Sequence, residues 1–284
     1  MRNLLDKRIL ITGAGSGLGK SLALLFANNG WRVACTDRDA NTAAATLKEL
    51  QAAGGTGLAM ALDVTADGSF TSVVERLKKD WGGLDVLINN AGVASGGTVE
   101  DAPQSQWDWV MNINFYGCLR GARAVIPLLK AQNGGHIVNV ASFAGIANPP
   151  AMASYNVAKA AVVSLSETLR FELFPNHIGV SVVCPEFFKT NLLATSQSSA
   201  PNGSPGTSPQ IEKIVGRLMD KATITAEHVA ADIYDAVQNN RFMVIPHPDA
   251  RQRYHFKRFF PELFFKTAQK ATVKFLQKSP ARPA

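Results

Sequence analysis

Residues 12–19 read Thr12-Gly13-Ala14-Gly15-Ser16-Gly17-Leu18-Gly19, directly after a short apolar run at residues 8–12. A helical pattern opens at Leu18, on the far side of this turn. Backbone N–H groups at the start of a helix, with no Cβ atoms in the way, form a cradle for a pyrophosphate. Glycine is common in turns, so the glycines alone say little. Strand, turn and helix stand here in the order that a dinucleotide site requires, and the sequence therefore predicts one.

Seven short apolar runs alternate with longer helical patterns along the chain. The runs lie at residues 8–12, 32–37, 57–63, 84–89, 136–142, 180–185 and 241–246. Four of the helical patterns lie at residues 18–28, 40–52, 69–81 and 106–130. Continuous apolar strands separated by helices indicate a parallel sheet that is covered on both faces. We therefore expect a single doubly wound, Rossmann-like α/β domain over residues 1–250, with about seven strands and helices on both faces.

Composition argues against several other classes of protein. The chain has 284 residues, 46% of them hydrophobic and 18% charged, which allows a sizeable core and excludes a disordered chain. Three cysteines without a close pair argue against a disulfide framework, and five histidines show no metal-ligand spacing. The sequence contains neither a run of about 18 uncharged apolar residues nor an apolar leader at its start. We expect a soluble protein of the reduced cytoplasm that needs no metal.

Positive charge is concentrated near the C-terminus. The net charge is +7, and residues 251–278 hold eight Lys or Arg and one acidic residue, which leaves 21 of each elsewhere. We expect residues 251–284 to form a basic, aromatic and helical extension, with Phe264, Ala268, Ala271 and Phe275 on one face and lysines on another. Packing on the domain or on a sister subunit is favoured about two to one over peripheral contact of residues 251–278 with an anionic membrane. Nucleic acid comes third, because the charge is confined to this short extension.

The second apolar run ends at Asp37, 24 positions after Gly13. A carboxylate at this place can accept hydrogen bonds from both hydroxyls of an adenosine ribose and would repel a 2′-phosphate, which favours NAD over NADP. The neighbouring Arg38 could tolerate that phosphate, so NADP stays open as the less favoured cofactor. The structural alternative for Asp37 is a helix N-cap, since a helical pattern follows at once.

Tyr155 and Lys159 stand four positions apart in an apparent helix. Residues at this spacing share one helix face, so the phenol and the ammonium can point into the same space. A free tyrosine has a pKa of about 10, and a nearby ammonium and a positively charged nicotinamide ring would both lower it. Ser142 closes the fifth apolar run, where its hydroxyl can hydrogen-bond a substrate oxygen. Each feature alone is more often a helix face or a cap, but together with the phosphate turn they indicate catalysis.

These motifs resemble those of the short-chain dehydrogenase/reductase family over residues 10–246. The shared motifs are residues 12–19, Asp63-Val64, Asn89-Asn90-Ala91-Gly92, Asn112-Ile113-Asn114, Ser142, Tyr155 with Lys159, and Pro185 with Thr190. The resemblance implies an NAD-dependent oxidoreductase that interconverts a secondary alcohol and a ketone or aldehyde. In such an enzyme the alcohol proton passes to Tyr155 while a hydride passes to the nicotinamide.

The resemblance also implies roles for single residues. Tyr155 would be the acid/base, Lys159 would bind the nicotinamide ribose and lower the pKa of the phenol, and Ser142 would polarise the carbonyl. Asn114 would anchor a water that relays protons from the lysine. Asp63 and Val64 would contact the adenine, and Thr190 would contact the pyrophosphate or the carboxamide. The other expected cofactor contacts are Gly13, Ser16, Gly17, Leu18, Gly19, Asp37, Arg38, Asn90, Ala91, Gly92, Tyr155, Lys159, Pro185 and Phe188.

Two segments near the expected site leave alternatives open. Glu186 follows Pro185 where the family usually has glycine, which leaves the conformation of that turn and the contact made by Phe188 open. Glu186 could engage a polar substrate or turn to solvent, and we assign it no catalytic role. The Ser-, Pro- and Gly-rich residues 195–209 lie within an expected substrate loop at about residues 190–215. A lid over the site is slightly favoured there over a plain surface insertion, because ligands of open α/β sheets bind at the carboxyl ends of the strands.

Candidate walls of a substrate pocket are mostly apolar. They are Ala94, Phe143, Ala144, Pro149, Pro150, Met152, Phe187 and Phe188. Apolar walls suit a lipophilic ketone or alcohol, with core packing as the competing interpretation at roughly even odds. A hydroxysteroid, a retinoid-like or fatty carbonyl compound and an aryl ketone stay open, and a sugar is less favoured.

Two alternative functions stay open beside this interpretation. A non-catalytic dinucleotide sensor could use the same fold, although it would not need a proton-transfer tyrosine. An NADP-dependent carbonyl reductase is the closest enzymatic alternative. The resemblance implies a homodimer or homotetramer without settling which.

Overall fold

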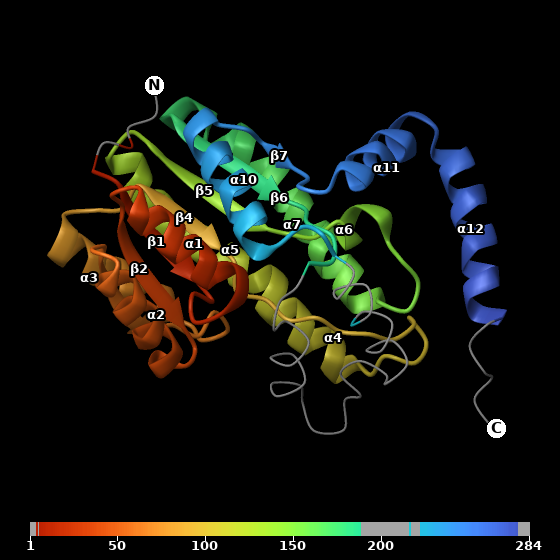
Figure 1. Ribbon diagram of the computed structural model, residues 1–284, viewed down its shortest axis with the longest axis horizontal. Helices are drawn as coiled ribbons and strands as arrows, with labels where there is room; N and C mark the ends of the chain where they lie inside the picture. Colours follow the sequence, from red (N-terminus) through yellow and green to blue (C-terminus); the bar gives the residue numbers. More distant parts are fainter. Residues whose placement is uncertain (1–3, 5, 189–215, 217–221, 278–284) are drawn as a thin grey trace.

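The computed structural model describes residue 4, residues 6–188, residue 216 and residues 222–277 (Figure 1). The expected substrate loop at about 190–215, Thr190 and the chain from residue 278 onward lie outside the described residues. Side chains of the last helix are described as far as Val273.

One parallel sheet of seven strands organises the described chain, in the order β3-β2-β1-β4-β5-β6-β7. This confirms the predicted doubly wound, Rossmann-like sheet. Strand order reverses between β1 and β4, which is the point where such sheets bind ligands. The strands are β1 (Arg8–Thr12), β2 (Arg32–Asp37), β3 (Thr56–Ala61), β4 (Val86–Asn89), β5 (Gly135–Val140), β6 (Ile178–Val183) and β7 (Met243–Val244).

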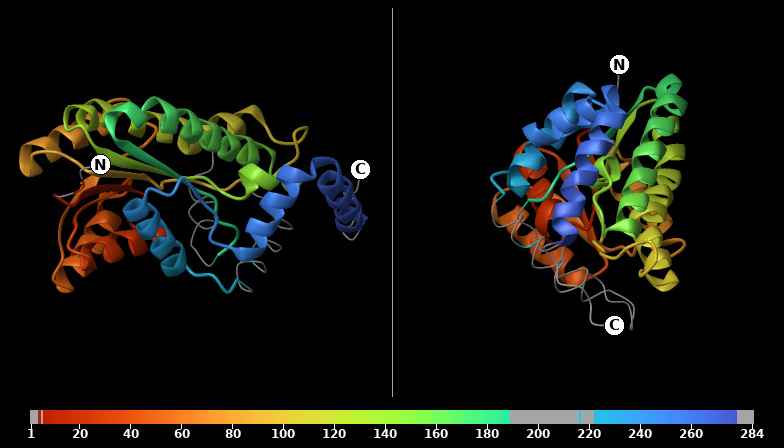
Figure 2. Two further views of the ribbon diagram at one scale, coloured as in Figure 1. Left: turned by 90° about the horizontal axis from the view of Figure 1, so that it is seen from above. Right: turned by 90° about the vertical axis from the view of Figure 1, so that its right-hand side faces the viewer.

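Helices cover both faces of the sheet (Figure 2). One face carries α1 (Gly17–Asn28), α2 (Ala40–Ala52) and α10 (Ala226–Asn239). The other face carries α3 (Ser69–Trp81), α5 (Gly117–Ala131) and α7 (Ala153–Glu172). The remaining elements are α4 (Gln104–Met111), the π-helix η1 (Asn112–Tyr116), α6 (Ala144–Ala147), the 3₁₀ helix η2 (Phe174–Asn176), α11 (Pro248–Phe259) and α12 (Pro261–Gln277).

The central strands are apolar on both faces because two hydrophobic clusters lie against them. In β1 all five residues are buried, whereas the edge strand β3 is only partly covered. Leu22 and Phe26 of α1 pack with Ile233 of α10 in the first cluster, and all three side chains are fully buried. Burying a side chain of this size stabilises the fold by about 1.5–3 kcal/mol. The sheet therefore holds the strand ends, and the loops that follow them, in fixed positions.

Two details differ from the sequence prediction. The helical pattern at residues 106–130 is not one helix, because the π-helix η1 separates α4 from α5. The fifth strand ends at Val140, so Ser142 lies beyond the strand, in the turn that leads into α6. Both differences fall at the cavity described below, and π-helical turns are frequent at functional sites.

The described part of the extension is helical and is formed by α11 and α12. Both views show α12 standing apart from the sheet and its covering helices, beyond α11 (Figures 1 and 2). Within the described residues, no helix combines the length and the apolar character needed to cross a membrane. No cluster of metal-ligating side chains occurs among the described residues either.

Candidate active site

A cavity of about 550 Å³ opens at the carboxyl ends of the central strands. It begins beside Asp37 at the end of β2, passes the first glycine-rich turn, and reaches Phe187 after β6. The predicted residues that line it are Gly13, Ser16, Gly17, Leu18, Asp37, Arg38, Asp63, Val64, Asn90, Ala91, Gly92, Ser142, Tyr155, Lys159, Pro185 and Phe188. Residues from seven separate segments are thus brought together by the sheet topology.

Asp37 closes one end of the cavity with a half-buried carboxylate. Its Oδ2 accepts the backbone N–H of Gly15 at 3.1 Å, and its Oδ1 accepts that of Asp39 at 3.2 Å. The helix N-cap proposed as the alternative role is taken by Asp39, whose side chain accepts the N–H of Asn41 at 2.9 Å. Asp37 is therefore fixed by the phosphate turn and faces the cavity.

The glycine-rich turn is packed tightly against the start of α1. A Cβ atom on Gly19 would lie 2.0 Å from the carbonyl oxygen of Gly13, so only glycine lets the helix approach the turn. Gly19 consequently packs behind the turn and is not among the residues that line the cavity. Ser16 stands at the N-cap, and its side chain makes no capping bond to the described first turn. The helix N-terminus thus faces the cavity and suits a pyrophosphate.

Asn90 ties this turn to the end of β4. Its side-chain Nδ2 donates to the carbonyl oxygens of Thr12 and Gly13 at 2.9 and 3.2 Å. The backbone N–H groups of Asn90 and Ala91 both donate to Thr12 Oγ1 at 3.0 Å. These bonds hold together the two strand ends between which the strand order reverses.

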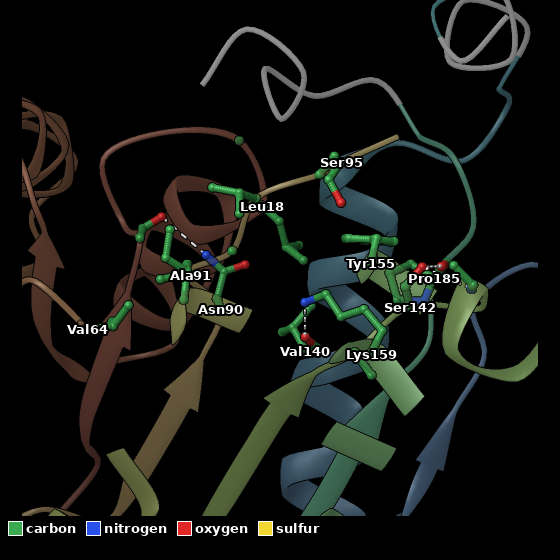
Figure 3. A pocket seen from close by; sticks show the side chains of 18 of the residues that line it. Leu18, Val64, Asn90, Ala91, Ser95, Val140, Ser142, Tyr155, Lys159 and Pro185 are labelled. Atoms are coloured by element: carbon green, nitrogen blue, oxygen red, sulfur yellow. Dashed lines mark hydrogen bonds between the residues drawn. The ribbon is translucent and has the colours of Figure 1, made fainter. Parts of the chain in front are cut away.

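Tyr155 and Ser142 lie side by side on the opposite wall, as Figure 3 shows. Tyr155 is only 7% exposed, and the Ser142 side chain lies close enough to favour its ionised form. Burial raises the pKa of Tyr155 and outweighs the Ser142 contact, which lowers it. The sequence-based expectation of a lowered pKa is wrong for the chain by itself, because removing a phenolate from water costs more than the Ser142 contact stabilises.

Ser142 is oriented by the turn in which it lies. Its Oγ accepts the N–H of Ala144 at 3.1 Å and lies 3.4 Å from the carbonyl oxygen of Pro185. With this arrangement the hydroxyl stays beside the phenol. The two groups together can contact one substrate oxygen.

Lys159 lies one helical turn below Tyr155 and is 4% exposed. Its Nζ donates to the carbonyl oxygen of Val140 at 2.9 Å and lies 5.8 Å from the centroid of the Tyr155 ring (Figure 3). Burial lowers the pKa of Lys159. The ammonium and the phenol therefore share one space, as their spacing predicted.

Asn114 lies on the π-helix η1 and is fully buried behind the cavity. Its Nδ2 donates to Val93 O, and its Oδ1 accepts the N–H of Val93, both at 2.9 Å. It is not among the residues that line the cavity. A Cβ on Gly92 would lie 3.0 Å from Asn114 Oδ1 and 3.4 Å from Lys159 Nζ, which places the three residues together. The water-anchoring role implied for Asn114 stays a prediction.

The substrate end of the cavity is apolar, with one exception. Seven of the expected wall residues line it, namely Ala94, Phe143, Ala144, Pro149, Met152, Phe187 and Phe188. Pro150 was wrongly expected there, because it is exposed and turned away in the loop before α7. The exception is the ion pair of Glu186 with Arg253 of α11, both of which line the cavity.

Arg253 is a charged wall residue that the sequence analysis did not predict. Its guanidinium lies 5.0 Å from the centroid of the Phe143 ring, so it contacts both Glu186 and Phe143. The turn is held further by the backbone N–H of Glu186, which donates to His247 Nδ1 at 3.2 Å. The only sequence signal was the basic character of the extension, which says nothing about where one arginine points. Trp109, Ile113 and Ala147 also line the cavity and were not expected.

Comparison with known proteins identifies the class of this fold and site. Residues 7–201 match the short chain dehydrogenase family. The chain therefore belongs to the short-chain dehydrogenase/reductase family of oxidoreductases, whose members bind a nicotinamide dinucleotide. This confirms the resemblance drawn from the motifs.

Three relatives show how far the similarity extends. The "Probable oxidoreductase EphD" of Mycobacterium tuberculosis is 34% identical over 271 residues, covering 93% of this chain and 45% of that protein. The chain thus spans less than half the length of EphD. The "CLA biosynthesis dehydrogenase/reductase" of Lactiplantibacillus plantarum is 31% identical, covering 88% of this chain and 91% of its own. A crystal structure of a short chain dehydrogenase/reductase from Burkholderia phymatum in complex with NAD is 30% identical, with a TM-score of 0.84, covering 98% of this chain and 97% of the other.

Proposed function

We propose that the chain is an NAD(H)-dependent oxidoreductase that interconverts a lipophilic secondary alcohol and its ketone or aldehyde. The observation that carries this proposal is the placement of Ser142, Tyr155 and Lys159 on one wall of a cavity whose far end is Asp37. A non-catalytic sensor would have no use for a buried phenol placed beside a serine hydroxyl in the cavity wall.

The residues of the cavity fit a nicotinamide dinucleotide. The turn at Gly13–Gly17 and the start of α1 would hold the pyrophosphate, and Asp37 would hold the adenosine ribose. Asp63 and Val64 line the cavity at the adenine end. When bound, the dinucleotide supplies the hydride acceptor or donor. Asp37 favours NAD, and the relative from Burkholderia phymatum in complex with NAD supports that preference. Arg38, which also lines the cavity, leaves NADP as the weaker cofactor.

The protein groups then act on the oxygen of the substrate. In the reduction direction Tyr155 holds the proton that the developing alkoxide takes up, and the Ser142 hydroxyl stabilises that oxygen. In the oxidation direction Tyr155 accepts the alcohol proton. Lys159 lies close enough to stabilise the phenolate by its charge, since it shares the same water-poor space.

Apolar walls support the substrate class. Phe143, Met152 and Phe187 offer hydrocarbon surface beside the catalytic serine and tyrosine, which suits a lipophilic carbonyl compound.

The cysteines support a reducing, cytoplasmic location. Cys35, Cys118 and Cys184 are free and buried. Burial raises the pKa of the Cys35 and Cys184 thiols to about 12 and that of Cys118 to about 11, so all three stay protonated.

The test is to assay a panel of secondary alcohols and ketones with NAD(H) and with NADP(H). Turnover of each compound is measured from the change in nicotinamide absorbance. We expect turnover of aryl ketones or medium-chain and long-chain ketones, with higher kcat/KM for NADH than for NADPH. A protein that binds NADH and turns over none of the panel would contradict the catalytic proposal. A strong preference for NADPH would contradict the cofactor assignment.

A further inference from the structure

The two helices of the extension expose an unusual share of large apolar side chains. Five of the ten exposed large hydrophobic residues of the described chain lie between residues 259 and 273. They are Phe259, Phe260, Leu263, Phe265 and Val273, which are 69%, 60%, 53%, 44% and 52% exposed. Exposed aromatic and aliphatic side chains concentrated in one short segment indicate a region of contact with a partner.

The same segment carries cations without acidic partners. Arg258, Lys266 and Lys270 are exposed and form no ion pair within the described part of the chain. Glu262 is the single acidic residue in residues 251–273. We call α11 and α12 together the hairpin. Because the remainder of the chain carries no net charge, the positive field of the molecule is centred on the hairpin.

The hairpin is fixed at one end and free at the other. Arg253 of α11 pairs with Glu186, and Lys257 donates to the carbonyl oxygen of Ile146, so α11 is held beside the mouth of the cavity. Phe264 of α12 packs edge-on against Phe256 of α11, with 6.0 Å between ring centroids. Beyond this contact α12 stands away from the body in both views (Figures 1 and 2). The expected packing of the extension on its own domain is thus made by α11.

We propose that the hairpin surface, defined as Arg258, Phe259, Phe260, Leu263, Phe265, Lys266, Lys270 and Val273, docks on an anionic phospholipid bilayer. Helices that lie in a membrane interface combine apolar side chains with Lys and Arg, and their binding depends on anionic lipid. The hairpin surface has this combination on two consecutive helices. A symmetric contact between two copies of the hairpin would set cations against cations, so charge complementarity favours the bilayer over a second copy.

The experiment is co-sedimentation of the full chain with vesicles of phosphatidylcholine alone and of phosphatidylcholine with phosphatidylglycerol. We expect binding to the phosphatidylglycerol vesicles, weak binding to phosphatidylcholine, and release when salt rises from about 0.05 M to about 0.5 M. The double variant Lys266→Glu/Lys270→Glu is expected to bind at least about tenfold more weakly. The matched control is Lys78→Glu/Lys79→Glu on α3, which reverses two exposed lysines outside the hairpin and leaves binding unchanged.

A second variant separates the apolar contribution from the charge. Phe259→Ser/Phe260→Ser is expected to lower vesicle binding while the melting temperature stays within a few degrees of the parent, since both rings are exposed. Binding that is equal on both vesicle types, or equal for the Lys78→Glu/Lys79→Glu and Lys266→Glu/Lys270→Glu variants, overturns the proposal. A second pair of results also overturns it: the parent binds neither vesicle type, and Phe259→Ser/Phe260→Ser elutes as a smaller oligomer than the parent in size-exclusion chromatography. The surface is then a subunit interface.

Discussion

At the scale of single residues, the proposed chemistry depends on one buried phenol. Tyr155 is held against Ser142, and burial keeps its pKa above that of a free tyrosine in the chain by itself. The phenol is therefore protonated at neutral pH, which suits it to donate a proton to a developing alkoxide. Lys159, whose pKa burial lowers, is held by Val140 O within the same space.

Replacing Tyr155 with phenylalanine removes only the hydroxyl. We expect kcat to fall by about 10²–10⁴-fold, the usual contribution of a positioned acid or base, while NADH binding stays within a few-fold of the parent. Steady-state kinetics and fluorescence titration with NADH measure the two quantities. The control is Tyr116→Phe, since Tyr116 is 47% exposed and lies on η1 away from the cavity lining. Retained turnover in Tyr155→Phe would refute the assignment.

The raised pKa of Tyr155 also sets a pH dependence. Oxidation needs the phenolate, so kcat/KM for the alcohol should rise with pH into the alkaline range. Reduction needs the phenol, so kcat/KM for the ketone should hold at neutral pH and fall only as the phenol ionises. Initial rates across the pH range, in both directions, measure the profiles. An oxidation profile that is already level in acid solution would be inconsistent with Tyr155 as the base.

Asp37 should control the choice of dinucleotide. Asp37→Ser removes the carboxylate that would repel a 2′-phosphate, and we expect the ratio of kcat/KM for NADPH to that for NADH to rise by about 10- to 100-fold. The matched control is Asp39→Ser, two residues along, where serine can still cap α2 and the preference should not move. An unchanged ratio in Asp37→Ser would remove this residue from the cofactor site.

At the scale of elements, a buried ion pair joins β1 to the start of β4. Arg8 and Asp85 have side chains only 7% and 3% exposed, and their bond measures 2.9 Å from Nη2 to Oδ1. Asp85 Oδ2 also accepts the backbone N–H of Arg8 at 2.8 Å. This pair lies at the amino ends of the strands, opposite the cavity, and fixes the register of the two central strands.

Breaking this pair should destabilise the fold without touching the site. We expect Asp85→Ala to lower the free energy of unfolding by about 3–5 kcal/mol, because the buried guanidinium of Arg8 then keeps only the exposed carboxylate of Asp6, 3.1 Å away, as its ion-pair partner. Urea denaturation followed by circular dichroism measures this change. The control is Glu49→Ala, which breaks the exposed pair with Lys20 and should cost less than about 1 kcal/mol. Equal effects of the two substitutions would contradict the account given for β1 and β4.

Elements could be predicted from the sequence wherever the pattern is local. Residues 40–52 and 69–81 are helices with the predicted bounds, and the first two strands match as well. The ends of the other strands moved by one or two residues, as at Ser142, where apolar side chains continue into a buried turn. The break at η1 was missed because five residues of π-helix are too short a segment to change the helical pattern of the surrounding sequence visibly.

The residues of the candidate site likewise fall into those that local motifs predict and those that only tertiary packing places. Gly13, Asp37, Tyr155 and Lys159 come from short motifs whose spacing predicts their neighbours, and the structure brings them to one cavity. Arg253 could not be predicted, because it is more than 60 positions from Glu186 and reaches it only through the packing of α11. Pro150 was misplaced because being next to a wall residue in sequence does not place a residue on the same side of a loop.

At the scale of the whole molecule, the sheet and the hairpin differ in how firmly they are held. Two clusters of fully buried residues lie on either side of the sheet, whereas most of the described side chains of α12 are exposed. Local opening is easiest where few apolar contacts must be broken. The cooperative unit is therefore the sheet with its covering helices.

Hydrogen exchange should reveal this difference. We expect amides of α12 to exchange at least about a hundredfold faster than those of β1, β4 and β5 in the free protein. Mass spectrometry after pepsin digestion resolves these segments. Protection of α12 equal to that of β1 would show that the hairpin is covered in solution, and dilution would then tell whether a second subunit covers it.

Arg253 belongs to a helix outside the sheet and yet borders the space in which a substrate would lie. One part of the substrate wall is thus encoded after residue 247, apart from the segment that carries Ser142, Tyr155 and Lys159. Exchanging the region after residue 247 between relatives should alter which compounds are accepted while the proton-transfer groups keep their geometry. Chimaeras of this kind offer a route to new specificity, and a bulky fusion partner attached at this end of the polypeptide would disturb selectivity before it disturbs folding.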